Sequence, residues 1–113
     1  MKHKVVLVPF PFDDLSSTKV RPAVCLTEPI GEHKHVVLAF ITSRVPGEPL
    51  PTDLVFTETD KGFSATGLRV SSTLQLHRMM AVTTNIIARE LGQLPASTQK
   101  EVEGKLKLLF GIK

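Results

Sequence analysis

Short β-branched and apolar segments dominate the first half of the chain, and the connections between them leave no room for a helical crossover. Three such segments are Lys4 to Phe10, Pro22 to Thr27 and His35 to Thr42, of which the last is the most apolar. Parallel strands need a crossover of about a dozen residues or more, usually containing a helix. We therefore expect antiparallel neighbours, with the third segment in the middle of the sheet.

Two further segments, Asp53 to Phe56 and Leu68 to Leu76, continue the strand pattern. Proline- and glycine-containing turns separate the segments, as at Pro46 to Pro51 and Glu58 to Gly62. Many short strands joined by turns favour a small barrel over a doubly wound sheet. The predicted fold class is mainly β, a β-barrel plus short helices, in a single domain over residues 1–113.

The last third of the chain has a different pattern. Met79 to Leu94 fits either a short helix around Thr84 to Ala88 or a late strand. Thr98 to Phe110 predicts a helix that covers the barrel, because its apolar residues recur at helical spacing and form one face. These residues are Val102, Leu106 and Leu109.

The ends of this helix also have sequence signals. Thr98 and Glu101 fit a capping box, in which each side chain satisfies a backbone donor of the first turn. Gly111 is the expected C-terminal cap.

Composition limits the classes of partner and compartment. The chain is 42% hydrophobic and has a net charge of +3, which is compatible with a polyanionic partner but does not require one. No segment has the roughly 20 apolar residues that span a bilayer, so we expect no membrane association. The single cysteine, Cys25, lies in an apolar run and is expected to be buried, which fits a reducing, cytoplasmic location.

The four histidines do not form a metal motif. His33 and His35 are two residues apart and would lie on one face of a strand. No cysteine or carboxylate cluster completes a tetrahedral set, so we expect neither a metal nor another cofactor. An enzyme that uses this pair to bind a metal is the least favoured alternative. His77, at a strand end, is either a general base or a hydrated edge residue.

Hydroxyl groups and arginines gather at the ends of the predicted strands. Arg21 ends the first polar loop and precedes Pro22, and Thr42-Ser43-Arg44 ends the central segment. If these ends converge, a phosphodiester would meet guanidinium forks and hydroxyl donors together. The alternative is that arginines beside strands are simply hydrated. The later segment adds Arg69, Ser71 and Ser72.

These residues make the chain resemble the MazF/PemK family of toxin ribonucleases. The opening VVLVPFPFDDLSSTKVRPAVCL resembles the family's first hairpin, and LAFITS resembles its third strand, which ends in a functional threonine. GLRVSSTLQLHRM resembles a later strand that follows a glycine-containing loop. The combination of Arg21-Pro22 with Thr42-Ser43 is the most specific part of the resemblance.

The resemblance implies an SH3-like antiparallel barrel of the MazF/PemK/CcdB type with a C-terminal helix, usually a homodimer. It also implies an endoribonuclease that cleaves single-stranded RNA without a metal or the ribosome. In that reaction the RNA 2′-hydroxyl attacks its own phosphate and leaves a 2′,3′-cyclic phosphate and a 5′-hydroxyl. The expected protein partner is a cognate antitoxin peptide, disordered until it binds.

Site residues follow from the resemblance by position. Arg21 matches the family's catalytic arginine, and Thr42 matches its catalytic threonine. Some members carry an acidic general base in the first loop, where this chain has Leu15 to Thr18. The base therefore stays open between Asp13, Asp14, His77 and Arg21 acting alone. Six further residues are expected to bind RNA, namely Lys19, Ser43, Arg44, Arg69, Ser71 and Ser72.

Because the general base is not assigned, the sequence also allows a second interpretation of the function. A barrel of this family could bind protein or nucleic acid, DNA included, without cutting it, as in related toxins that poison a topoisomerase. The chain has no tryptophan or tyrosine, so RNA bases have few aromatic platforms beyond loop phenylalanines such as Phe12 and Phe63. Of these two, Phe12 is expected to be the exposed one.

Overall fold

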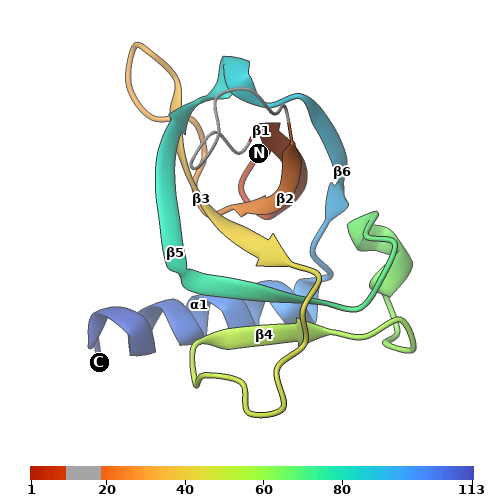
Figure 1. Ribbon diagram of the computed structural model, residues 1–113. Helices are drawn as coiled ribbons and strands as arrows, with labels where there is room; N and C mark the ends of the chain where they lie inside the picture. Colours follow the sequence, from red (N-terminus) through yellow and green to blue (C-terminus); the bar gives the residue numbers. More distant parts are fainter. Residues whose placement is uncertain (10–18) are drawn as a thin grey trace.

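Six antiparallel strands form one curled sheet in the computed structural model, which describes residues 1–9 and 19–113 (Figure 1). Their order across the sheet is β4-β5-β3-β2-β1-β6, so β3 lies in its interior. The mainly β class, the antiparallel pairing and the inner position of the third strand are confirmed. The strands are β1 (Lys4–Pro9), β2 (Val20–Cys25), β3 (His35–Thr42), β4 (Asp53–Phe56), β5 (Ser72–Thr83) and β6 (Arg89–Gln93).

Two strands begin elsewhere than predicted. β2 starts at Val20, so Arg21 is part of the strand and pairs with Val8 of β1. β5 starts at Ser72, so the prediction of a strand from Leu68 was wrong. The reason is the short partner strand, because β4 ends at Phe56, which pairs with Ser72. The loop before β5 instead follows the short 3₁₀ helix η1 (Phe63–Thr66).

β5 bends sharply in its middle (Figure 1). Phe40 of β3 pairs with Gln75, but the preceding residue, Ala39, pairs with Met79. Three residues of β5, Leu76 to Arg78, therefore have no partner on β3 and form a bulge, which bends a strand and increases its twist. After the bend, β5 runs on to Thr83, and the 3₁₀ helix η2 (Thr84–Ile86) leads into β6. Both interpretations of Met79 to Leu94 were thus partly correct.

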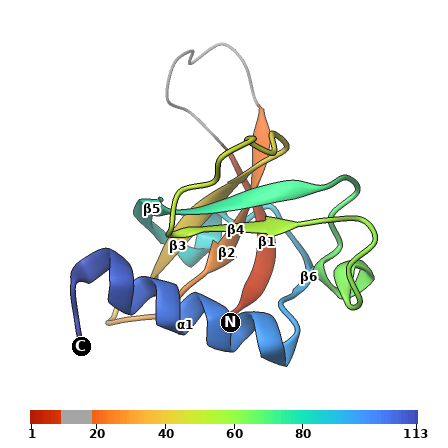
Figure 2. The ribbon, with the colours of Figure 1, turned by 90° about the horizontal axis from the view of Figure 1, so that it is seen from below.

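The C-terminal helix, α1 (Ala96–Phe110), lies along one side of the curled sheet (Figure 2). It begins directly after Pro95, and no side chain caps its first turn. The predicted capping box was wrong, because Thr98 is already inside the first turn. Gly111 is the C-terminal cap as predicted, with a left-handed φ of 66°. Within the described residues, no helix is both long enough and apolar enough to cross a membrane.

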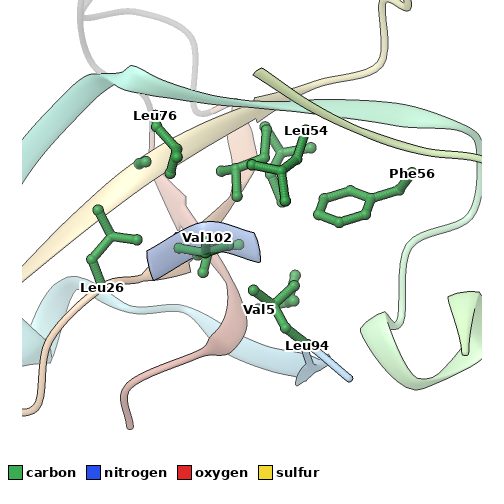
Figure 3. Packing of buried hydrophobic residues seen from close by; sticks show 11 residues of the cluster. Val5, Leu26, Leu54, Phe56, Leu76, Leu94 and Val102 are labelled. Carbon is green, nitrogen blue, oxygen red and sulfur yellow. The ribbon is translucent and has the colours of Figure 1, made fainter. Parts of the chain in front are cut away.

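The curl gives the sheet two apolar cores. Neighbouring residues of β1 point into different clusters, Val5 into one and Val6 into the other, as the alternation of a strand requires. The first cluster lies between the sheet and α1, which contributes the fully buried Val102 (Figure 3). The second contains Cys25, which is fully buried. Burial raises the pKa of this thiol to about 11, so Cys25 is a protonated core residue at neutral pH, as predicted.

Candidate functional site

Two cavities that share Arg21 and Ile41 lie beside the ends of β2 and β3. The first cavity has a volume of about 890 Å³ and the second of about 420 Å³. The first is lined by Arg21, Phe40, Ile41, Thr42, Arg44, Val45, Pro46, Gln75 and Arg78. The second is lined by Leu7, Val20, Arg21, Pro22, Ile41, Ser43, Gly67, Leu68, Arg69, Val70, Ser72, Arg89 and Leu91.

The pairing of β2 with β3 brings Arg21 and Thr42 to the same cavity. Ala23 pairs with Phe40 in the last registered position of this ladder. If the register is continued by two residues, Arg21 lies opposite Thr42. The ladder ends here because Pro22 has no N–H to donate. Arg21 is exposed and Thr42 is half-buried, and both line the first cavity.

The hydroxyl of Thr42 is oriented by its own turn. Its Oγ1 accepts the backbone N–H of Arg44 at 3.2 Å, which leaves the hydroxyl hydrogen to be donated to another acceptor. The backbone oxygen of Arg44 in turn accepts the Thr73 hydroxyl of β5 at 2.8 Å. These two bonds hold the residues after β3 against β5 and give Thr42 and Arg44 defined positions at the cavity.

Every arginine of the chain lines one of the two cavities, and none of the lysines does. The chain has five arginines and nine lysines, which together make its 14 cationic side chains. Among the described residues that line the cavities, none is acidic. Arginine differs from lysine in its planar fork, which binds two oxygens of a phosphate at once. The arginines are Arg21 in both cavities, Arg44 and Arg78 in the first, and Arg69 and Arg89 in the second.

Four of these guanidinium groups make no ion pair within the described part of the chain. Arginines held for stability are usually paired with a carboxylate when they lie together, because like charges repel. A cluster of unpaired arginines around a cavity therefore favours an anionic ligand. The four residues are Arg44, Arg69, Arg78 and Arg89.

The structure brings most of the predicted site residues together. Lys19 is exposed and lines neither cavity. Ser71 also lines neither, and its Oγ accepts the backbone N–H of Glu58 at 3.0 Å. Ser72 does line the second cavity, but it is buried and its hydroxyl donates to the backbone oxygen of Val70 at 2.8 Å. The residues gathered as predicted are Arg21, Thr42, Ser43, Arg44, Arg69 and Ser72.

The candidate bases are placed differently. His77 lies exposed on the bulge of β5 and is not among the described residues that line either cavity. Asp13 and Asp14, like Phe12, lie outside the described residues. Phe63 is partly buried in η1 and packs against the first core cluster.

Three polar lining residues were not predicted from the sequence, namely Gln75, Arg78 and Arg89. Gln75 reaches the first cavity through its pairing with Phe40, and Arg78 lies on the bulge of β5, which no local pattern predicts. Arg89 lies at the second cavity because β6 pairs with β1 and places Arg89 opposite Leu7. The available signal was the residue type, since all arginines of the chain are at the site.

The two neighbouring histidines do not lie on one strand face. His33 is in the turn before β3, and Lys34 between them has a left-handed φ of 55°. The predicted placement was therefore wrong, and the two rings meet edge to face with centroids 6.2 Å apart. Across residues 1–9 and 19–113, no three histidine, cysteine or acidic side chains come together in a way that could hold a metal ion.

Comparisons with known proteins agree with this architecture. Residues 2–110 match the family described as "PemK-like, MazF-like toxin of type II toxin-antitoxin system". The fold is similar to that of the Mycobacterium tuberculosis toxin MazF-mt6, with a TM-score of 0.74 and 20% identity over 97% of this chain and 98% of that one. No curated protein matches the sequence.

Two other similar structures contain an antitoxin. One is the MazE-MazF complex (Form-II) from Deinococcus radiodurans, with a TM-score of 0.69 and 22% identity over 99% of this chain and 95% of that one. The other is an endoribonuclease in complex with its cognate antitoxin from a mycobacterial species, with a TM-score of 0.72 and 12% identity. That match covers 100% of this chain and 94% of the other. Together these likenesses confirm the predicted barrel-type fold with its C-terminal helix.

Proposed function

The chain belongs to the PemK-like, MazF-like toxin family of type II toxin–antitoxin systems, and from this we propose that it cleaves single-stranded RNA in the cytoplasm without a metal ion or the ribosome. Toxins of this family are endoribonucleases. The observation that carries the proposal for this chain is the placement of Arg21 and Thr42 on one cavity whose charged lining residues, among those described, are all arginines.

In the proposed reaction the nucleophile belongs to the RNA. The 2′-hydroxyl oxygen attacks the adjacent phosphorus and loses its proton, and the bond to the 5′-oxygen of the next nucleotide breaks. Arg21 stabilises the additional negative charge of the phosphorane and donates a proton to the leaving oxygen. The Thr42 hydroxyl donates to a non-bridging oxygen, which is consistent with its own oxygen being occupied by the Arg44 N–H. Donors fixed in advance at a developing charge are often the largest catalytic contribution.

The proton acceptor for the 2′-hydroxyl is a separate assignment. Asp13 and Asp14 remain candidates from the first loop, as does Arg21 acting alone. His77 is the least favourably placed candidate, because its side chain lines neither cavity.

We expect the purified protein to cut a labelled single-stranded RNA in the presence of EDTA. The products should be a 2′,3′-cyclic phosphate and a 5′-hydroxyl, identified by mass spectrometry and by resistance of the 3′ end to ligation. The same RNA with 2′-deoxyribose at the cleaved position should stay intact, because it lacks the nucleophile. Bound but uncut RNA would favour the non-cleaving barrel instead, and cleavage only after a divalent metal is restored would contradict metal independence.

We further propose that the active form is a homodimer. Three large apolar side chains at the end of α1 are exposed, Leu108 by 57%, Phe110 by 60% and Ile112 by 60%. A partner surface would remove this apolar area from water, which favours association. Light scattering at micromolar concentration should give about twice the 12.4 kDa of one chain. A monomer whose mass does not change with concentration would contradict the proposal.

The proposed protein partner is a cognate antitoxin. Two of the similar structures are complexes of that kind. The arginine-lined cavities suit an acidic segment that orders on binding.

A further inference from the structure

We infer that the second cavity is a subsite for the nucleotide next to the scissile phosphate, with Arg69 and Arg89 as its binding residues. The inference rests on the proposed function, since it names a further part of the same RNA site. Its starting point is that the two cavities share Arg21. A chain whose phosphate meets Arg21 in the first cavity has its neighbouring nucleotide within reach of the second.

The lining of the second cavity combines the two surfaces that a nucleotide presents. Leu68 and Leu91 supply apolar walls, which suit the flat faces of a base. Arg69 and Arg89 supply guanidinium groups that stack on bases and bind phosphate through two donors at once. The volume of about 420 Å³ is in the range of sites that hold small organic ligands, roughly 300–1,000 Å³.

Two glycines build this cavity by letting the loop before β5 lie directly against β6. A Cβ on Gly67 would be 2.2 Å from the backbone oxygen of Leu91, and a Cβ on Gly92 would be 2.1 Å from that of Ala65. Such contacts are open only to glycine. They bring Arg69 of the loop and Arg89 of β6 to the same cavity, although neither lies on a strand that pairs with the other's segment.

Hydrogen bonds then hold the loop in this position. The buried Thr66 donates its hydroxyl to the backbone oxygen of Phe63 at 2.6 Å and accepts the N–H of Leu68 at 3.2 Å. Ser72 closes the far end through its bond to Val70. The second cavity is therefore formed before any ligand binds, and a preformed site loses little entropy on binding.

The test combines a protein substitution with a substrate that lacks one base. The cleaved bond is first mapped on a long RNA with the unmodified protein, and oligonucleotides in which the nucleotide on one or the other side of that bond is abasic are then compared, since these keep the 2′-hydroxyl nucleophile and the 5′-oxygen leaving group. Removal of the base that occupies the subsite should lower kcat/KM by about 10- to 100-fold, the range for losing the stacking of one base on a side chain. In Arg89→Ala the same base removal should have almost no further effect, because the contact is already lost. Arg89→Lys, which keeps the charge but not the planar fork, should lie between the two.

Lys100→Ala is the matched control, since Lys100 is an exposed cation on α1 that lines neither cavity. An unchanged unfolding midpoint for Arg89→Ala shows that the fold is retained. Equal losses in Arg89→Ala for the intact and the abasic substrates, or no loss, would overturn the subsite while leaving the proposed function standing. Failure of the unmodified protein to cut any RNA would overturn both. Unchanged RNA kinetics together with weaker inhibition by a polyglutamate peptide would assign the cavity to an acidic protein segment and overturn the inference.

Discussion

Replacing Arg21 with alanine is expected to slow RNA cleavage by ~10²-fold or more, because charge stabilisation in the transition state is often the largest catalytic contribution. Arg21 is the charged residue that lines both cavities, so its loss removes the guanidinium common to both proposed nucleotide contacts. The effect should appear mainly in the maximal rate constant measured under single-turnover conditions. The reason is that the substitution removes an interaction made in the transition state rather than one made equally with bound RNA.

Two other variants test whether the loss of rate is specific to the Arg21 guanidinium. Arg21→Lys keeps a positive charge without the two-donor fork and should recover only part of the rate. Lys100→Ala removes one positive charge away from both cavities and should leave the rate unchanged. Arg21 is exposed, so circular dichroism of the alanine variant should match that of the unmodified protein. Near-normal cleavage by Arg21→Ala would refute the catalytic assignment.

Substitution of Gly67 by alanine is expected to destabilise the fold by about 2–5 kcal/mol, which combines left-handed backbone strain with overpacking. Gly67 has a φ of 74°, and an added Cβ would be 2.2 Å from the Leu91 backbone oxygen. Neither atom is at the end of a flexible side chain, so the loop before β5 would have to move away from β6. Denaturant titration measures the loss in the free energy of unfolding.

Two other glycines allow the effect of backbone strain on stability to be measured separately from that of overpacking. Gly31 has the same φ of 74° but no atom within 4 Å of its added Cβ, so Gly31→Ala should cost only the strain of about 1–2 kcal/mol. Gly104 lies within α1 with neither positive φ nor a close neighbour, so Gly104→Ala should stabilise the protein by about 0.5–1 kcal/mol. If Gly67→Ala costs no more than Gly31→Ala, the close packing of the loop on β6 is not important for stability.

The strands whose bounds could be predicted from the sequence are those marked by neighbouring residues alone. β3 and β4 have the predicted bounds, His35–Thr42 and Asp53–Phe56, because β-branched runs there end at prolines and polar turns. The start of β5 was not readable in this way. Residues Leu68 to Ser71 have strand-like composition, but β4 is too short to pair with them, and the length of a partner strand is not a local property.

The residues of the candidate site also differ in whether the sequence alone predicts their position. The residue types and order determined that Arg21, Thr42 and Arg44 stand at strand ends, and the resemblance to a family assigned roles to two of them. The arginines that were missed, Arg78 and Arg89, stand on segments that reach the cavities through the bulge in β5 and the pairing of β6 with β1. The sequence gives the chemistry of each side chain directly. Which side chains come together depends on contacts between residues that are far apart in the sequence.

The sequence alone predicted a mainly β chain with antiparallel neighbours, a C-terminal helix and arginines beside the strand ends, since these follow from local propensity, connection length and residue type. The gathering of all five arginines around two cavities that share Arg21 became visible in the three-dimensional structure alone. This is because the bulge in β5 and the close contacts at Gly67 and Gly92 depend on packing between residues far apart in the chain, which no window of neighbouring residues contains.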